Sequence, residues 1–210
     1  LFYLCLYFIT FFFNAALVSA AIMRLEGGEP TIMDGFNAAR ERIVPILGYA
    51  AIAATVGMLL QALKNKENNF LVRMLGSGLG VAWTLSTFLV VPVLVQKKVG
   101  PIDAIKQSVA LLKSTWGENA IGNVGLGAVF GLIMFGTIAL GVLLVIAAGS
   151  VSVALAITIG VLAVLAVIAL GVVQSALSGI YSAALYRYAT AGEAPAAFGS
   201  TGLQNAFAPK

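Results

Sequence analysis

The chain is a succession of long apolar runs separated by short polar segments. An apolar run of about 20 residues is long enough to cross a bilayer as a helix. The breaks between the runs predict five transmembrane helices, over residues 2–23, 44–63, 71–96, 119–148 and 151–188. The fold class predicted from this pattern is an all-α integral membrane protein, with residues 1–210 forming a single membrane domain.

The last two predicted helices are the least clearly separated. Only the four residues Gly149–Ser152 interrupt them, and the stretch from Asn119 to Tyr186 contains no Asp, Glu, Lys or Arg. A helix over 151–188 would have to tilt or extend beyond the bilayer. Three shorter spans within 119–188 are the alternative, and they would place the C-terminus on the opposite side of the membrane.

Amphipathic segments stand between the apolar runs, and we expect each to form a helix lying on the membrane surface. Such helices are predicted over about 30–43 and 100–116, with a third candidate over about 200–208. Thr31 and Asp34 are spaced as a capping pair, and Pro101 starts the second helix. The apolar stripes of the first two helices consist of Ile32, Phe36, Ala39 and Ile43, and of Ile102, Ile105, Val109, Leu112 and Trp116.

The first two amphipathic segments align with each other at a displacement of 69 residues. Asp34 then matches Asp103, and the paired positions that follow are Gly35 with Ala104, Phe36 with Ile105, and Ala39 with Ser108. This pattern predicts an internal repeat, in which an interfacial helix is followed by a transmembrane hairpin. Shared physics without common ancestry is the alternative explanation of so short a similarity.

Composition supports a membrane location, because 60% of the residues are hydrophobic and 10% are charged. Soluble domains are about 45–50% apolar and about 25% charged. With five spans, nine basic residues fall on one face and three on the other, so the first face is predicted to be cytoplasmic. The nine are Arg24, Arg40, Arg42, Lys97, Lys98, Lys106, Lys113, Arg187 and Lys210; the three are Lys64, Lys66 and Arg73.

This orientation places the start of the first span outside, so we expect one earlier helix, about six spans in all and a cytoplasmic C-terminus. Lys97, Lys98, Lys106 and Lys113 are expected to contact anionic lipid head groups. The orientation and these contacts account for the net charge of +4 without a nucleic-acid partner.

Candidate sites of chemistry are scarce. The chain has no His, one Cys and no carboxylate within the predicted spans, so we expect no catalytic residues, no metal ligands and no cofactor. Asn14, Asn123 and Gln174 are instead candidate intramembrane polar contacts, either between helices or around a polar path or ligand pocket. Further candidates are Gln61, Asn119, Thr84, Ser86, Thr87, Ser175 and Ser178.

Small residues and one proline indicate how the helices pack. Gly76 with Gly80, and Gly127 with Gly131, are spaced four apart, which allows helices to approach closely. Pro92 is predicted to kink the third span near its end.

Several stretches together resemble an uncharacterised prokaryotic family of multi-pass membrane proteins, domain of unknown function 6159. They include "FFFNAALVSAAIMRLEGGEPTIMDGFNAARERI", "GVAWTLSTFLVVPVLVQKKVGPIDAIKQSVALLKSTWGEN" and "ALYRYATAGEAPAAF". The resemblance implies a multi-pass protein of a prokaryotic cytoplasmic membrane. It implies no activity and no functional residues.

Two functional classes fit these observations. The first is a non-catalytic accessory subunit or scaffold of a membrane complex, with other membrane protein subunits as partners. The second is a transporter or channel for a small solute or lipid. The absence of acidic residues from the spans favours the first class, because ion-coupled transport generally uses one.

Overall fold

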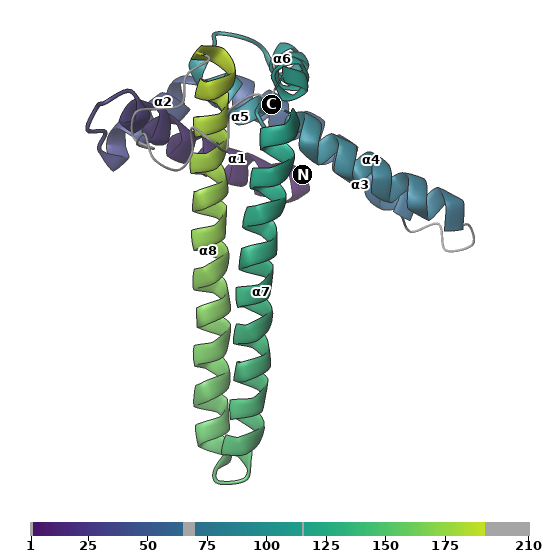
Figure 1. Cartoon of the computed structure of the whole chain (residues 1–210), viewed down its shortest axis with the longest axis vertical. Helices are drawn as coiled ribbons and strands as arrows, with labels where there is room; N and C mark the ends of the chain where they lie inside the picture. The colour runs from purple at the N-terminus through teal and green to yellow at the C-terminus, as the bar shows by residue number, and fades with distance from the viewer. Residues whose placement is uncertain (1, 65–69, 115, 192–210) are drawn as a thin grey trace. The chain divides into compact units, whose positions relative to one another are not determined.

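The computed structural model describes residues 2–64, 70–114 and 116–191, and the side chains of these residues except 64, 70–76, 116–124 and 191. All regular structure in these ranges is helical (Figure 1), which confirms the predicted all-α class. The helices are α1 (Phe2–Leu25), α2 (Ile32–Glu41), α3 (Ile43–Lys64), α4 (Phe70–Thr87), α5 (Val90–Gln96), α6 (Pro101–Ser114), α7 (Trp116–Gly149) and α8 (Val153–Ala191).

Five helical segments in the described ranges are long and apolar enough to cross a membrane, as the apolar runs predicted. They are Phe2–Leu25, Ile43–Leu63, Ser77–Gln96, Gly125–Gly149 and Val153–Thr190. Residues 119–188, for which two spans and three spans were both possible, contain two helices, α7 and α8, joined by a turn at 150–152.

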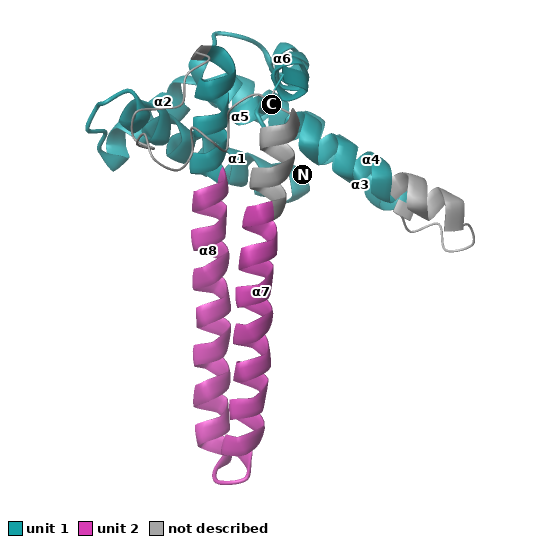
Figure 2. Cartoon of the chain, in the orientation of Figure 1, with its two compact units in different colours: residues 1–118, 179–210 teal, residues 119–178 magenta. Residues whose placement is uncertain are grey.

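The chain divides into two compact units (Figure 2). Unit 1 comprises Leu1–Glu118 and Gly179–Lys210, and unit 2 comprises Asn119–Ser178. That the whole chain forms one membrane domain stays a prediction.

The core of unit 1 forms where α1 meets the short helices α2 and α5. Ile22, Leu89, Leu94 and Leu185 are almost completely buried in it. Aromatic rings extend this core along α1 toward α3, because the Phe11 and Tyr49 centroids, both packed against the cluster, lie 4.5 Å apart. The end of α1 that carries Ile22 therefore packs in one core with residues from several other segments of unit 1.

The amphipathic helix α2 packs through its smallest residues. Gly35 and Ala39 are buried, and a Cβ on Gly35 would lie 2.6 Å from the Ala16 carbonyl oxygen of α1. Ile32, which belongs to the apolar stripe of the predicted interfacial helix, is 82% exposed. A small-residue face lets two backbones approach closely, so the larger side chains flank the contact and do not form it.

The helix α6 shows the same arrangement. Its buried residues are Ala104, Ser108 and Leu112, whereas Ile102 of the predicted stripe is 60% exposed. Two residues at the ends of the predicted stripes belong to the following helices, since Ile43 opens α3 and Trp116 opens α7. The interfacial helix predicted over 200–208 lies outside the described residues.

The third predicted span consists of two helices, α4 and α5, separated at Phe88 and Leu89. Pro92 has no N–H group and cannot donate a hydrogen bond to the Phe88 carbonyl four residues earlier. The discontinuity falls where that bond would be missing, so Pro92 accounts for it. The predicted kink is thus a short non-helical break.

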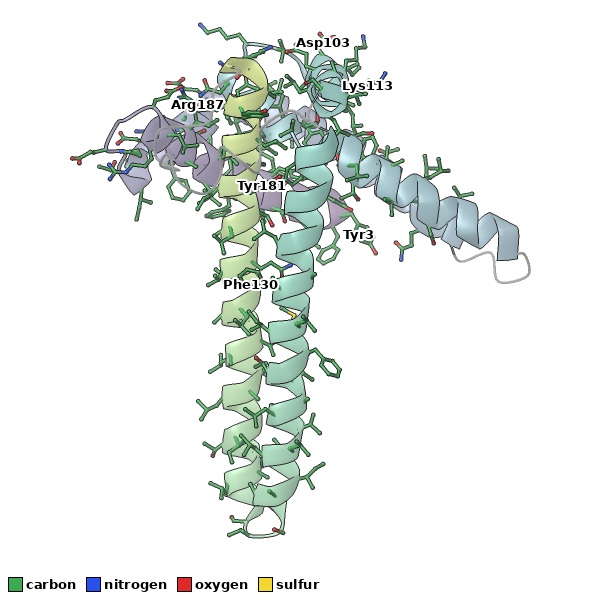
Figure 3. All side chains as sticks on the ribbon, in the orientation of Figure 1. Tyr3, Asp103, Lys113, Phe130, Tyr181 and Arg187 are labelled. Carbon is green, nitrogen blue, oxygen red and sulfur yellow. The ribbon has the colours of Figure 1, made fainter. Side chains whose placement is uncertain are left out.

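Unit 2 is a helical hairpin made of most of α7 and the first two thirds of α8 (Figure 2). The two helices approach each other closely at Gly141, where a Cβ would lie 2.9 Å from the Ala163 Cβ. Side chains along this hairpin are almost entirely carbon (Figure 3). Most of its large apolar residues are exposed; Leu132, Phe135, Ile146 and Val153 are each about 70% exposed.

Candidate functional site

A pocket with several polar lining residues lies in unit 1 between α1, α3 and α4. It has a volume of about 630 Å³, within the range of small-molecule sites. Residues that line it come from all three helices, at positions within the candidate membrane spans. They are Tyr7, Ala53, Gly57, Leu60, Gln61, Ser77, Gly80, Val81, Trp83, Thr84 and Leu85.

Polar groups are unevenly distributed along this pocket. Gln61 and Ser77 lie near the ends of α3 and α4 that face the 65–69 connection, whereas Ala53 and Leu85 lie about 12 Å further along their helices, at 1.5 Å per residue. At the deeper end the Thr84 hydroxyl donates to the Gly80 carbonyl at 2.9 Å, so its hydrogen is already used. The pocket is therefore more polar at one end than at the other.

The side of the pocket formed by α1 depends on a glycine. Tyr7 lies over Gly57 of α3, and a Cβ at that position would lie 2.8 Å from the Tyr7 hydroxyl oxygen. Only glycine therefore allows this ring to approach α3 so closely without shifting. The tyrosine places one hydroxyl group between the polar and apolar ends of the pocket.

A second polar arrangement surrounds the break between α4 and α5. The Ser108 hydroxyl of α6, completely buried, accepts a hydrogen bond from the Leu89 N–H at 3.1 Å and donates one to the Ser86 carbonyl at 2.6 Å. Both partners are backbone groups at the break. The Ser108 side chain thus supplies hydrogen bonds that the interrupted helix cannot make at these two backbone groups. The same bonds connect α6 to the break between α4 and α5.

The three amides predicted as intramembrane contacts do not line the described pocket. Asn14 lies on α1 with its Oδ1 buried and without a hydrogen-bond partner, and a Cβ on Gly179 would lie 3.3 Å from this atom. Gln174 is half-buried on α8 in unit 2. The side chain of Asn123 lies outside the described residues. Their predicted roles stay predictions.

Two other predicted candidates, Gln61 and Thr84, do line the pocket. Composition alone gave no reason to choose them over the other amides and hydroxyls, because their proximity depends on how α3 and α4 pair. Tyr7 and Ser77 also line it and were not predicted. In the sequence, the feature that these four residues share is that they are polar and lie within or near apolar runs.

The predicted packing glycines differ in their surroundings. Among the described residues, and apart from the local backbone of α7 itself, no heavy atom lies within 4 Å of the Cβ position on Gly127 or Gly131. Gly80 lines the pocket, and the surroundings of Gly76 are outside the described side chains. Close approaches occur instead at Gly35, Gly57 and Gly141.

Charged groups of unit 1 lie on the segments that connect its helices, on α6 and near the end of α8. Lys97, Lys98, Lys106 and Lys113 are all exposed. Arg187, near the end of α8 (Figure 3), forms an ion pair with Glu26 at 3.0 Å. The end of α8 and the segment after α1 therefore lie on the same side of unit 1.

The predicted capping pair at α2 is confirmed. The Asp34 carboxylate accepts a hydrogen bond from the Thr31 N–H at 2.8 Å, and the Asp34 N–H donates to the Thr31 hydroxyl at 3.3 Å. The backbone hydrogen bond, followed by that from the Thr31 hydroxyl, holds the pKa of Asp34 below its ordinary value of 3.8. This carboxylate is thus accounted for by the start of a helix.

Together these features define a helical protein with several helices long and apolar enough to cross a membrane, consistent with a membrane protein. The chain belongs to a family of unknown function (DUF6159), whose model matches residues 1–196. This confirms the resemblance seen in the sequence. Comparison with curated proteins and with solved structures gave no match.

Proposed function

We propose that the protein is a non-catalytic accessory subunit or scaffold of a membrane complex. The observation that supports this most is the length of the uncharged helices in unit 2. The part of α7 in this unit, residues 119–149, is about 46 Å long at 1.5 Å per residue. The hydrocarbon core of a bilayer is about 30 Å thick.

Tilting does not remove this excess. At a tilt of 40°, the upper end of the observed range, the same segment still extends about 35 Å along the membrane normal. The excess can lie at either end of the segment, and at the hairpin end it brings apolar side chains to the head groups, where lipid tails do not cover them. Ile146, 68% exposed, and Val153, 71% exposed, lie near this end. A protein partner would bury these side chains.

A site-specific photocrosslinker in the full-length protein tests this proposal in its native membrane. With the crosslinker at Ile146 or Val153, we expect one discrete protein adduct, and stoichiometric co-purification of the same partner in native mass spectrometry. The matched control position is Val164, 59% exposed but further from the turn. Lipid adducts alone at all three positions, with a chain that purifies by itself, would contradict the proposal.

A transporter or channel for a small solute or lipid is the second candidate, and the pocket between α1, α3 and α4 favours it. Purified protein in liposomes would then accelerate the flux of a solute or the movement of a lipid between leaflets. Variants of Gln61 and Tyr7, which line the pocket, should slow it. A rate equal to that of protein-free liposomes for every tested solute and lipid would contradict this function.

We also infer that α2 and α6 are interfacial helices in two copies of a repeated unit. The displacement of 69 residues pairs buried Gly35 with buried Ala104, and buried Ala39 with buried Ser108. It also pairs the exposed Met33 with Ile102, placing one apolar side chain beside each first-turn aspartate. These side chains are available to enter the lipid while the small residues contact the protein.

The proposed orientation places these helices and the C-terminus on the cytoplasmic face of a prokaryotic inner membrane, with about six spans in the full protein. Nine basic residues on this face support it, and their exposed lysines would contact anionic head groups. In a variant with Cys5 replaced by Ala, a cysteine at Ser152 should react with an impermeant maleimide on intact cells. A cysteine at Ser114 should react only after lysis, and the reverse pattern would invert the topology.

A further inference from the structure

We propose that the pocket between α1, α3 and α4 binds an uncharged lipid whose head carries hydroxyl or ester groups, as a diacylglycerol does. The site is independent of the accessory-subunit proposal, because it lies in unit 1 and the apolar hairpin forms unit 2. Its lining residues lie within helices long and apolar enough to cross a membrane. A ligand would therefore enter from the bilayer.

The polarity of the pocket matches an amphipathic ligand in one orientation. Gln61 and Ser77 lie toward the end of the helical hairpin, near the membrane boundary, and both are exposed. The amide of Gln61 offers two donors and one acceptor, which suits ester carbonyls and a free hydroxyl. Ala53 and Leu85, about 12 Å deeper by helical rise, offer apolar surface to the start of an acyl chain.

The Tyr7 hydroxyl lies between these two ends. Its position over Gly57 keeps it beside the pocket wall, where it can donate a hydrogen bond to the ligand. Thr84 cannot donate its hydrogen to a ligand while it bonds the Gly80 carbonyl. The Gln61 amide and the Tyr7 hydroxyl are therefore the donors that would contact the head group.

The described lining of the pocket suits an uncharged head group. Among the lining residues that the structure describes, none carries a charge at neutral pH. A phosphate desolvated among these residues would have no basic partner in the described lining, which is costly for an anion. The basic residues of α6, Lys106 and Lys113, are on another helix that contributes no described residue to the pocket. Lys64 of α3 and Arg73 of α4 lie three and four residues along the chain from Gln61 and Ser77, so the test compares an uncharged lipid directly with an anionic one.

Fluorescence of Trp83, which lines the pocket, gives a direct readout. The chain has two tryptophans, Trp83 and Trp116, so a Trp116→Phe background isolates the signal. Full-length protein in phosphatidylcholine nanodiscs is titrated with diacylglycerol brominated on its acyl chains. We expect saturable quenching at low mole fraction, and only weak, non-saturating quenching by phosphatidylcholine or phosphatidylglycerol with the same brominated chains.

Val81→Phe is the main variant, because Val81 lines the pocket and is 60% exposed, so the larger ring narrows the pocket without entering the core. It should abolish the saturable component. Val129→Phe is the matched control, at a residue of unit 2 that is 55% exposed, and should leave quenching unchanged. Tyr7→Phe, which removes one hydroxyl, should weaken binding roughly threefold to tenfold, the range for one neutral hydrogen bond.

Three results would overturn the proposal. They are equal quenching by all brominated lipids, saturable quenching that survives Val81→Phe, or preferential quenching by phosphatidylglycerol, which would identify an anionic-lipid site. Competition by free glycerol at millimolar concentration would also overturn it, since the pocket would then hold a soluble polyol. Circular dichroism verifies that each variant remains helical. If a partner protein still co-purifies with Val81→Phe, the loss of lipid binding leaves the accessory-subunit proposal unaffected.

Discussion

Replacing Ser108 by alanine tests the most specific polar contact in unit 1. The substitution removes a single oxygen atom from a side chain that is completely buried. That atom accepts from the Leu89 N–H and donates to the Ser86 carbonyl. Ser108→Ala therefore leaves one backbone donor and one backbone acceptor without this partner, at a point where the helix itself is interrupted.

The expected loss of stability follows from these two bonds. A buried group left without a hydrogen-bond partner costs about 1–3 kcal/mol in proteins. Side-chain hydrogen bonds between membrane helices average about 0.6 kcal/mol, with a maximum near 1.7. Leu89 is itself completely buried, so water cannot easily replace the lost acceptor. We expect Ser108→Ala to lower the free energy of unfolding by about 1–3 kcal/mol.

The measurement is equilibrium unfolding of the purified protein in mixed detergent micelles, followed by circular dichroism. Ser19→Ala is the matched control, because Ser19 is 4% exposed and its hydroxyl has no hydrogen-bond partner. Removing that hydroxyl should be neutral or slightly stabilising. Equal losses for the two serines would show that the packing volume matters and that the two hydrogen bonds do not.

Two further predictions concern α2. Gly35→Ala should destabilise unit 1, because its Cβ would lie 2.6 Å from the Ala16 backbone oxygen. Gly78→Ala is the control in the same unfolding assay. No described neighbour outside the local helix backbone lies within 4 Å of its Cβ position, so this change should be neutral or stabilising. Asp34 has a lowered pKa, so its contribution to stability is complete above its ordinary value of 3.8 and disappears as pH falls through the lower folded value. Carbon-13 NMR of the carboxyl group should show this pKa rising toward the ordinary value in Thr31→Ala; an unchanged titration would refute the capping account.

The helices themselves were predictable from the sequence because each apolar run is longer than a bilayer core. The predicted start of the second span at residue 44 differs by one residue from that of α3 at Ile43, and the capping pair at Thr31 was recognised from its spacing. Such features depend only on neighbours along the chain. They require no knowledge of which helices touch.

The contacts between helices were less predictable. The apolar stripe of α2 was predicted from the sequence, but the close contact that Gly35 makes with α1 was not, and Ile32 of the stripe is exposed. Hydrophobicity ranks isoleucine above glycine, whereas the approach of two backbones rewards the smaller residue. The pocket was missed for a related reason, since Tyr7 and Gln61 are brought together by the packing of α1 on α3.

A chemical difference between the two proposed repeats, at a position that is completely buried in both, has a physical cause. The displacement of 69 residues places Ala39 opposite Ser108, and both are completely buried. It also places Met23 opposite Pro92. Because α1 is continuous from Phe2 to Leu25, its backbone groups bond within the helix, and an apolar alanine suffices. The proline-containing span is interrupted, so the equivalent position needs a hydroxyl.

This explanation predicts that Ser108 is needed only because of Pro92. In a Pro92→Ala background the span can become continuous, and the Leu89 N–H can bond the Leu85 carbonyl four residues earlier as in any α-helix. Ser108→Ala should then cost at least about 1 kcal/mol less than in the unmodified protein, a coupling large enough to resolve in a double-mutant cycle. Additive effects of the two substitutions would mean that the serine serves α6 alone. A clear coupling would show that one proline determines both the break in the span and the side chain that closes it.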